Sequence, residues 1–105
     1  MEAAARGAKS ARGLTVGVLP GCSRFDANPY IDVAIATNMG HARNAIIAHT
    51  SDSLIAIGGA YGTLSEMAFG LVLGKKVISL KSWSFDPRIV TVETPSEAVE
   101  EALKR

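Results

Sequence analysis

Residues 54–66 read LIAIGGAYGTLSE, and this stretch decides the fold of the chain. Its apolar start, Leu54 to Ile57, is typical of a buried strand, and the glycine-rich residues that follow predict a tight turn. A helix-like sequence begins at once, from residue 64 to 73. Such a turn directs several backbone N–H groups toward one point, at the positive end of the helix dipole, which favours phosphate. The predicted phosphate-binding residues of the turn are Gly58, Gly59, Ala60, Tyr61, Gly62 and Thr63.

The residues of this turn also have a purely structural explanation. Glycines supply the positive φ angles that a tight turn needs, whether or not a ligand binds. Thr63 and Glu66 have the spacing of a capping box, in which Glu66 would stabilise the start of the helix. The sequence leaves open whether Glu66 caps the helix or faces a ligand.

Composition narrows the class of protein. The 105 residues are 48% hydrophobic, which suffices for the core of one small domain, residues 1–105. A net charge of +1 indicates neither nucleic acid nor an anionic membrane as partner. No apolar run reaches the roughly 20 residues that span a bilayer, and the first residues lack the apolar centre of a secretory signal. The single Cys22 excludes an internal disulfide and fits a reducing compartment, so we expect a cytoplasmic protein.

The chain alternates between predicted helices and strands. The helices are expected at residues 2–11, 40–49, 64–73 and from 95 onward, and the strands at 14–19, 54–57, 76–80 and 89–92. Residues 22–37 are expected to form a loop, although Ile31, Val33 and Ile35 alternate with other residues. Thr94 should cap the last helix, with Pro95 in its first position. Trp83 and Phe85 are expected to close an edge of the core rather than to stack a base.

Short apolar strands between helices predict an α/β fold, a Rossmann-like and mostly parallel sheet with helices on both faces. In such sheets ligands bind beyond the carboxyl ends of the strands. The turn at residues 58–62 leaves the sheet at that edge and is the best candidate for the site. His41 and His49 lack the spacing of a metal site, so no metal is expected.

Two separated motifs resemble the LONELY GUY proteins, also called lysine-decarboxylase-like proteins. Residues 59–66, GAYGTLSE, are similar to the family signature PGGXGTXXE, and HARN at residues 41–44 falls where the family has His-X-Arg-Lys. The run from residue 17 to 44, with ANPY at residues 27–30, is more similar still to a sister group. That group is DprA-related and includes the molybdenum cofactor carrier proteins. The resemblance covers about residues 1–80.

The resemblance implies that Arg43, otherwise interpreted as a solvated surface residue, holds a phosphate together with the neighbouring Asn44. Asn44 stands where the LONELY GUY motif has lysine, and an asparagine supplies no charge. We therefore expect a binding protein for a phosphorylated ligand, either a nucleotide such as a nucleoside monophosphate or a pterin of the molybdenum cofactor type. The alternative is an enzyme, a nucleoside 5′-monophosphate phosphoribohydrolase. In that enzyme Glu66 would stabilise the ribosyl cation or orient water, and Arg43 would hold the phosphate.

The resemblance also carries an expectation about the sheet. Residues 1–8 resemble the helix after the family's second strand, so the first strand, first helix and second strand would be absent. In a sheet ordered 3-2-1-4-5, those strands would separate residues 14–19 from residues 54–57. We expect a truncated product or a gap filled by another chain. Relatives of this kind are usually homodimers or larger, and an incomplete sheet exposes apolar surface and strand edges, so we expect a homo-oligomer.

Overall fold

The computed structural model describes residues 1–104, which divide into two compact units. Unit 1 runs from Met1 to Arg43, and unit 2 runs from Asn44 to the C-terminus. Their strands form two parallel sheets, one in each unit. The strands at Val16–Leu19 and Ser53–Ile57 therefore belong to different sheets. Each unit is described by itself below.

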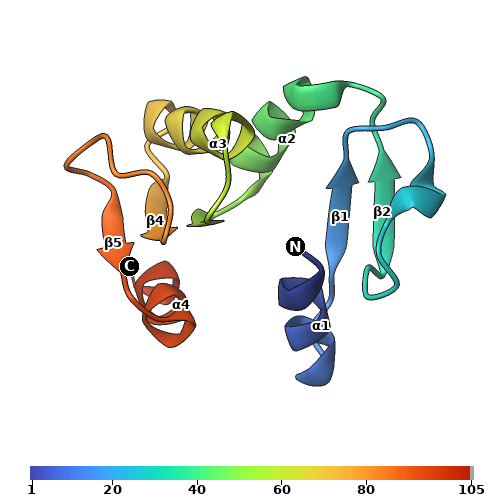
Figure 1. The fold of residues 1–105 in the computed structure, drawn as a ribbon, viewed down its shortest axis with the longest axis horizontal. Helices are drawn as coiled ribbons and strands as arrows, with labels where there is room; N and C mark the ends of the chain where they lie inside the picture. Colours follow the sequence, from blue (N-terminus) through green and yellow to red (C-terminus); the bar gives the residue numbers. More distant parts are fainter. Residues whose placement is uncertain (105) are drawn as a thin grey trace. The chain divides into compact units, whose positions relative to one another are not determined.

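Unit 1 places a helix before a two-stranded parallel sheet (Figure 1). Its elements are α1 (Glu2–Ser10), β1 (Val16–Leu19), the 3₁₀ turn η1 (Arg24–Asp26), β2 (Val33–Ala36) and the 3₁₀ turn η2 (Gly40–Ala42). Val16 of β1 pairs with Val33 of β2, and Val18 pairs with Ile35. Because side chains alternate along a strand, these four β-branched residues share one face of the sheet.

Asp32 ties the parts of unit 1 together. Its Oδ2 accepts hydrogen bonds from the Thr15 backbone N–H at 2.9 Å, from the Lys9 ammonium at 2.9 Å and from the Thr15 hydroxyl at 3.2 Å. The Thr15 backbone and the Lys9 charge hold the pKa of Asp32 below its ordinary value of 3.8. The carboxylate thus joins the end of α1 to the segments that lead into both strands.

The expected loop over residues 22–37 was wrong, because it contains η1 and the strand β2. Alternation of Ile31, Val33 and Ile35 indicated an extended segment. A strand of four residues is short enough to pass for loop when its partner is not known. Pairing with β1 supplies the hydrogen bonds that define it.

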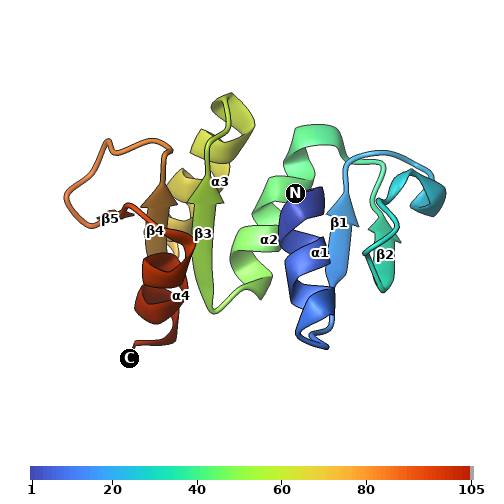
Figure 2. The same ribbon diagram turned by 60° about the horizontal axis from the view of Figure 1, so that its bottom comes forward.

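Unit 2 is a three-stranded parallel sheet with helices on both faces. Its elements are α2 (Arg43–Thr50), β3 (Ser53–Ile57), α3 (Tyr61–Val72), β4 (Lys76–Leu80), β5 (Val90–Val92) and α4 (Pro95–Leu103), with α2 beginning at the last residue of unit 1. The strand order is β3-β4-β5, and Figure 2 shows β3 and β4 side by side with α4 beside them. The predicted α/β class with parallel strands is confirmed.

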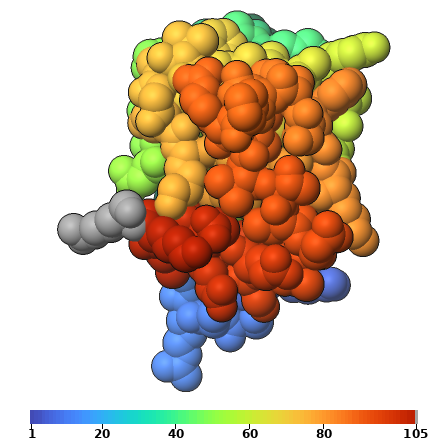
Figure 3. Space-filling view, turned by 90° about the vertical axis from the view of Figure 1, so that its left-hand side faces the viewer, coloured from blue at the N-terminus to red at the C-terminus, as the bar shows by residue number. Residues whose placement is uncertain are grey.

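The central strand β4 serves two hydrophobic cores. Val77 packs with Met67 and Leu71 of α3 on one face of the sheet. Ile78 and Leu80 pack with α4 on the other face. Figure 3 shows α4 in red and the connection from β4 to β5 in orange at the surface of this unit. Trp83 of that connection packs partly buried against the α3-side core, as predicted.

Two adjacent lysines donate hydrogen bonds to the C-terminal carbonyls of helices on the two faces of this sheet. Lys75 donates from its ammonium to the carbonyls of His49 and Ser51, where α2 ends. Lys76 donates to the carbonyls of Glu101 and Lys104 at 2.7 and 2.8 Å, where α4 ends. Cations at these positions complement the negative ends of the helix dipoles.

Helix α4 begins as the sequence predicted. The Thr94 hydroxyl accepts a hydrogen bond from the Glu97 backbone N–H at 3.2 Å, and Pro95 occupies the first turn. Thr94 also donates to the Glu97 carboxylate at 3.1 Å. This side-chain cap was recognisable because Thr94 and Glu97 lie within four residues of sequence.

Candidate functional site

The turn between β3 and α3 has a backbone that only glycine adopts easily. Gly58 has φ +55° and Gly59 has φ +91°. A Cβ on Gly59 would lie 2.0 Å from the Thr63 Oγ1 and 2.5 Å from the Thr63 Cβ, so no larger residue fits there without rearrangement. The turn therefore folds back against the first turn of α3 and leaves its backbone at the surface.

Helix α3 begins at Tyr61, three residues before the predicted start. The capping box of Thr63 and Glu66 is wrong, because the N-cap residue is Ala60 and no side chain caps the helix. The first hydrogen bond of the helix is donated by the Leu64 N–H to the Ala60 carbonyl at 3.1 Å. The N–H groups of Tyr61, Gly62 and Thr63 accordingly have no acceptor within the helix. These three amides are the donors that a phosphate would meet.

The connection after β4 holds this turn in place. The Gly58 N–H donates to the Leu80 carbonyl at 3.2 Å, and the Ser82 hydroxyl donates to the Gly58 carbonyl at 2.6 Å. The Trp83 indole N–H donates to the Ala60 carbonyl at 3.0 Å. These three hydrogen bonds hold the N–H and carbonyl of Gly58 and the carbonyl of Ala60. The turn is therefore anchored to β4 and to the connection that follows it.

Asn44 supports the first turn of α3 from below the surface. Its side chain is only 1% exposed, and its Nδ2 donates to the Gly62 carbonyl at 3.2 Å and to the Ser65 hydroxyl at 3.0 Å. The same Gly62 carbonyl accepts from Ser65 at 2.8 Å. The predicted contact of Asn44 with phosphate stays a prediction, and the contacts that the structure gives it are to the backbone of the predicted site.

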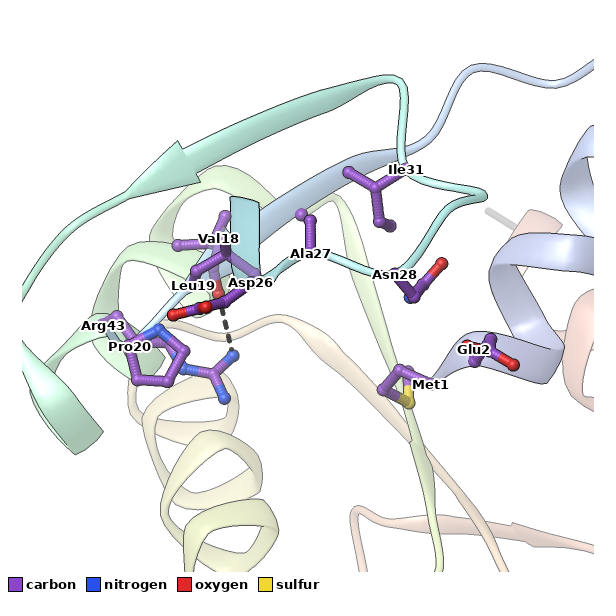
Figure 4. A pocket seen from close by; sticks show the side chains of 11 residues that line it. Met1, Glu2, Val18, Leu19, Pro20, Asp26, Ala27, Asn28, Ile31 and Arg43 are labelled. Carbon is purple, nitrogen blue, oxygen red and sulfur yellow. Dashed lines mark hydrogen bonds between the residues drawn. The ribbon is translucent and has the colours of Figure 1, made fainter. Parts of the chain in front are cut away.

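Arg43 is half-buried in unit 1, where its Nη1 donates to the Val18 carbonyl at 3.1 Å. It lines a pocket of about 320 Å³ at the carboxyl end of β1. Figure 4 shows Arg43 and Asp26 at one end of this pocket and Glu2 at the other. The remaining lining residues are Met1, Gly17, Val18, Leu19, Pro20, Ala27, Asn28 and Ile31.

Sequence reasoning missed three polar residues of this pocket, Glu2, Asp26 and Asn28. Asn28 belongs to the ANPY run that carried the family resemblance, so the sequence held a signal by which it could have been identified as a site residue. Asp26 had none, because a lone acidic residue in a loop is ordinarily a solvated surface group. Opposite charges on Asp26 and Arg43 allow the pocket to hold a polar ligand.

Glu66 lies half-buried on α3, three residues after Thr63. Residues three and four positions apart share a helix face, so Glu66 follows Gly62 and Thr63 along the same side of α3. Among residues 1–104 no cluster of three His, Cys, Asp or Glu side chains is placed to hold a metal ion. Within the same range no helix is both long and apolar enough to cross a membrane.

The chain matches one protein-family model and one curated relative over nearly all of its length. The model of the SLOG cluster4 family matches residues 1–104. An uncharacterized protein of Archaeoglobus fulgidus is 52% identical over 99 residues, which make up 94% of this chain and 65% of that protein. The chain thus spans less than two thirds of the length of this curated relative.

Two solved structures with similar folds are described as proteins that bind or carry the molybdenum cofactor. The molybdenum cofactor binding protein of Rippkaea orientalis superposes with a TM-score of 0.87 at 36% identity, over 95% of this chain and 67% of that one. The molybdenum cofactor carrier protein of Chlamydomonas reinhardtii gives a TM-score of 0.79 at 32% identity, over 95% and 66%. The resemblance to the LONELY GUY-like group that contains these carriers is confirmed.

Proposed function

This chain belongs to the SLOG cluster4 family, and we propose that it binds a small phosphorylated ligand, a nucleotide or a phosphate-bearing pterin of the molybdenum cofactor type. The observation that carries the proposal is the glycine turn before α3, which presents the amides of Tyr61, Gly62 and Thr63 at a helix N-terminus. Backbone donors at such a position favour an oxyanion. The relatives described as molybdenum cofactor binding or carrier proteins support the choice of ligand class.

The residues of the turn fit the phosphate end of such a ligand. The Gly59 position has no room for a side chain, so nothing larger than hydrogen screens the turn there. Anchoring by Leu80 and Ser82 fixes the turn before any ligand arrives, which lowers the entropic cost of binding. We further propose Arg43 as the counter-charge, because its planar guanidinium suits phosphate.

Titration of the protein with guanosine 5′-monophosphate tests this proposal by calorimetry. We expect saturable binding, and Arg43→Ala should weaken it by about 1.5–3 kcal/mol, the scale of a hydrogen bond to a charged group. Arg6→Ala on the exposed face of α1 is the matched control, because it removes the same charge elsewhere. Circular dichroism checks folding, since Arg43 also contacts the Val18 carbonyl. Unchanged affinity in Arg43→Ala would show that Arg43 is not part of the site. Failure of the unmodified protein to bind phosphorylated ligands would contradict the proposed function.

The phosphoribohydrolase is the second candidate, and the position of Glu66 one turn after the amides favours it. Incubation with adenosine 5′-monophosphate should then release adenine and ribose 5-phosphate, and Glu66→Ala should abolish the release. Saturable binding without any turnover would exclude the enzyme and support the binding function only.

We also propose that the protein is a cytoplasmic homo-oligomer. Its single cysteine favours the cytoplasm, and the apolar sheet face of unit 1 favours association between copies.

A further inference from the structure

An exposed aromatic pair lies beside the phosphate turn. The rings of Tyr61 and Trp83 stack with centroids 5.9 Å apart and planes inclined by 25°. Tyr61 is 79% exposed, so the ring face that does not meet Trp83 is open to solvent. Burial therefore contributes little to keeping a tyrosine at this position, whereas an open aromatic face is a surface on which a flat ring can stack.

The pair is rigid on its Trp83 side. The indole packs against the α3-side core and donates its N–H to the Ala60 carbonyl at 3.0 Å. Lys81, two residues earlier, has φ +53°, a conformation that costs a non-glycine residue free energy. After this bend the Ser82 hydroxyl meets the Gly58 carbonyl. The connection after β4 is thus fixed on the turn at two points, which holds Trp83 beside Tyr61.

Tyr61 belongs both to the aromatic pair and to the phosphate turn. Its backbone N–H is one of the three amides at the start of α3, and its ring projects from the same residue. A ligand whose phosphate rests on these amides has the rest of its body within reach of the tyrosine ring. Ligands that carry a flat heteroaromatic group a few bonds from a phosphomonoester match this arrangement.

We propose that Tyr61 and Trp83 form an aromatic platform that stacks the heteroaromatic ring of the ligand. The inference rests on the proposed function and deepens it, because it assigns the ligand to the heteroaromatic phosphomonoesters and excludes simple sugar phosphates. Guanine and pterin share the 2-amino-4-oxopyrimidine ring, so guanosine 5′-monophosphate is a stable probe for both sources. Stacking on an aromatic side chain is strong enough to dominate the choice between ligands with the same phosphate.

The experiment compares guanosine 5′-monophosphate with ribose 5-phosphate, which has the same phosphate and no base. Trp83 is the single tryptophan of the chain, so fluorescence excited selectively at tryptophan reports on the platform. We expect the nucleotide to bind about 5- to 150-fold more tightly than ribose 5-phosphate and to quench the fluorescence. Tyr61→Leu should remove most of this preference, and Tyr61→Phe, the matched variant that keeps the ring, should retain it. Ribose 5-phosphate affinity should be the same in all three proteins.

The outcomes distinguish failure of the aromatic platform from failure of the phosphate site. Equal affinity for both ligands with unchanged Trp83 fluorescence overturns the platform and leaves the phosphate site standing. A preference for the nucleotide that Tyr61→Leu does not reduce overturns the platform in the same way, because the base then binds elsewhere. Absence of binding by either ligand overturns the proposed function and the platform together. Circular dichroism of both variants verifies that the exposed substitutions leave the fold intact.

Discussion

At the scale of single residues, the constraint on Gly59 is steric as well as conformational. Its neighbour Gly58 has a comparable positive φ, but a Cβ on Gly58 would have no atom within 4 Å. A Cβ on Gly59 would overlap the Thr63 side chain. The two glycines therefore offer a matched comparison between backbone strain alone and backbone strain combined with a clash.

Gly59→Ala should lower the free energy of unfolding by about 2–4 kcal/mol, since left-handed strain of about 1–2 kcal/mol adds to overpacking. Gly58→Ala should cost only the strain, about 1–2 kcal/mol. Urea denaturation followed by circular dichroism measures both. Equal losses would show that Thr63 moves aside without cost, which would contradict the tight closure of the turn.

The sequence identified some residues of the site and missed others for physical reasons. The glycine turn was recognisable because a strand, a turn and a helix succeed one another within a dozen residues. The anchoring by Ser82 and Trp83 was not, because it joins the turn to a connection more than twenty residues away. The role of Asn44 beneath α3 is likewise a contact across the fold that no local pattern records.

At the scale of elements, α3 packs closely on its sheet through Gly70. A Cβ at Gly70 would lie 2.4 Å from the Leu54 Cδ1 and 2.9 Å from the Val77 Cγ2. Gly70→Ala should therefore destabilise the protein by about 1–3 kcal/mol, in spite of the better helix propensity of alanine. The midpoint of urea denaturation measures the change.

Gly7 in the middle of α1 is the control for this prediction, because a Cβ there would meet no atom within 4 Å. Gly7→Ala should stabilise by up to about 1 kcal/mol through helix propensity alone. Opposite signs for two glycine-to-alanine changes within helices would establish the close approach of α3. A gain of stability in both variants would refute it.

The boundaries of elements were predicted correctly where the residues that determine them lie close together in the sequence. The cap of α4 lies at Thr94, as predicted, because its partners are four residues or fewer apart. The start of α3 was placed three residues too late, since glycine at position 62 disfavours a helix interior and only the surrounding contacts override it. β2 was missed because a four-residue strand depends on its partner for recognition.

At the scale of the whole molecule, the sheet of unit 1 carries exposed apolar side chains. Val16, Val33 and Ile35 share one face, and each is about half exposed. Contiguous apolar surface of this kind is a frequent site of association between copies of a protein. The expected homo-oligomer would cover such surface.

Sedimentation velocity at micromolar concentration should therefore give a dimer or a larger species. Ile35→Lys should shift the distribution toward monomer, because a charge on the sheet face opposes its burial. Arg6→Lys, which changes an exposed residue of α1 without changing charge, should leave the distribution unaltered. A monomeric profile for the unmodified protein would contradict the oligomer.

The lysine pair at the beginning of β4 has a consequence for how unit 2 responds to chemical modification. Lys75 and Lys76 are adjacent in the chain, yet each ammonium serves a helix end on a different face of the sheet. Acetylation of one amine would withdraw the positive charge from a single layer and leave the other layer balanced. Modification of Lys75 should therefore weaken the end of α2, and modification of Lys76 the end of α4, so each helix layer of unit 2 depends on its own lysine.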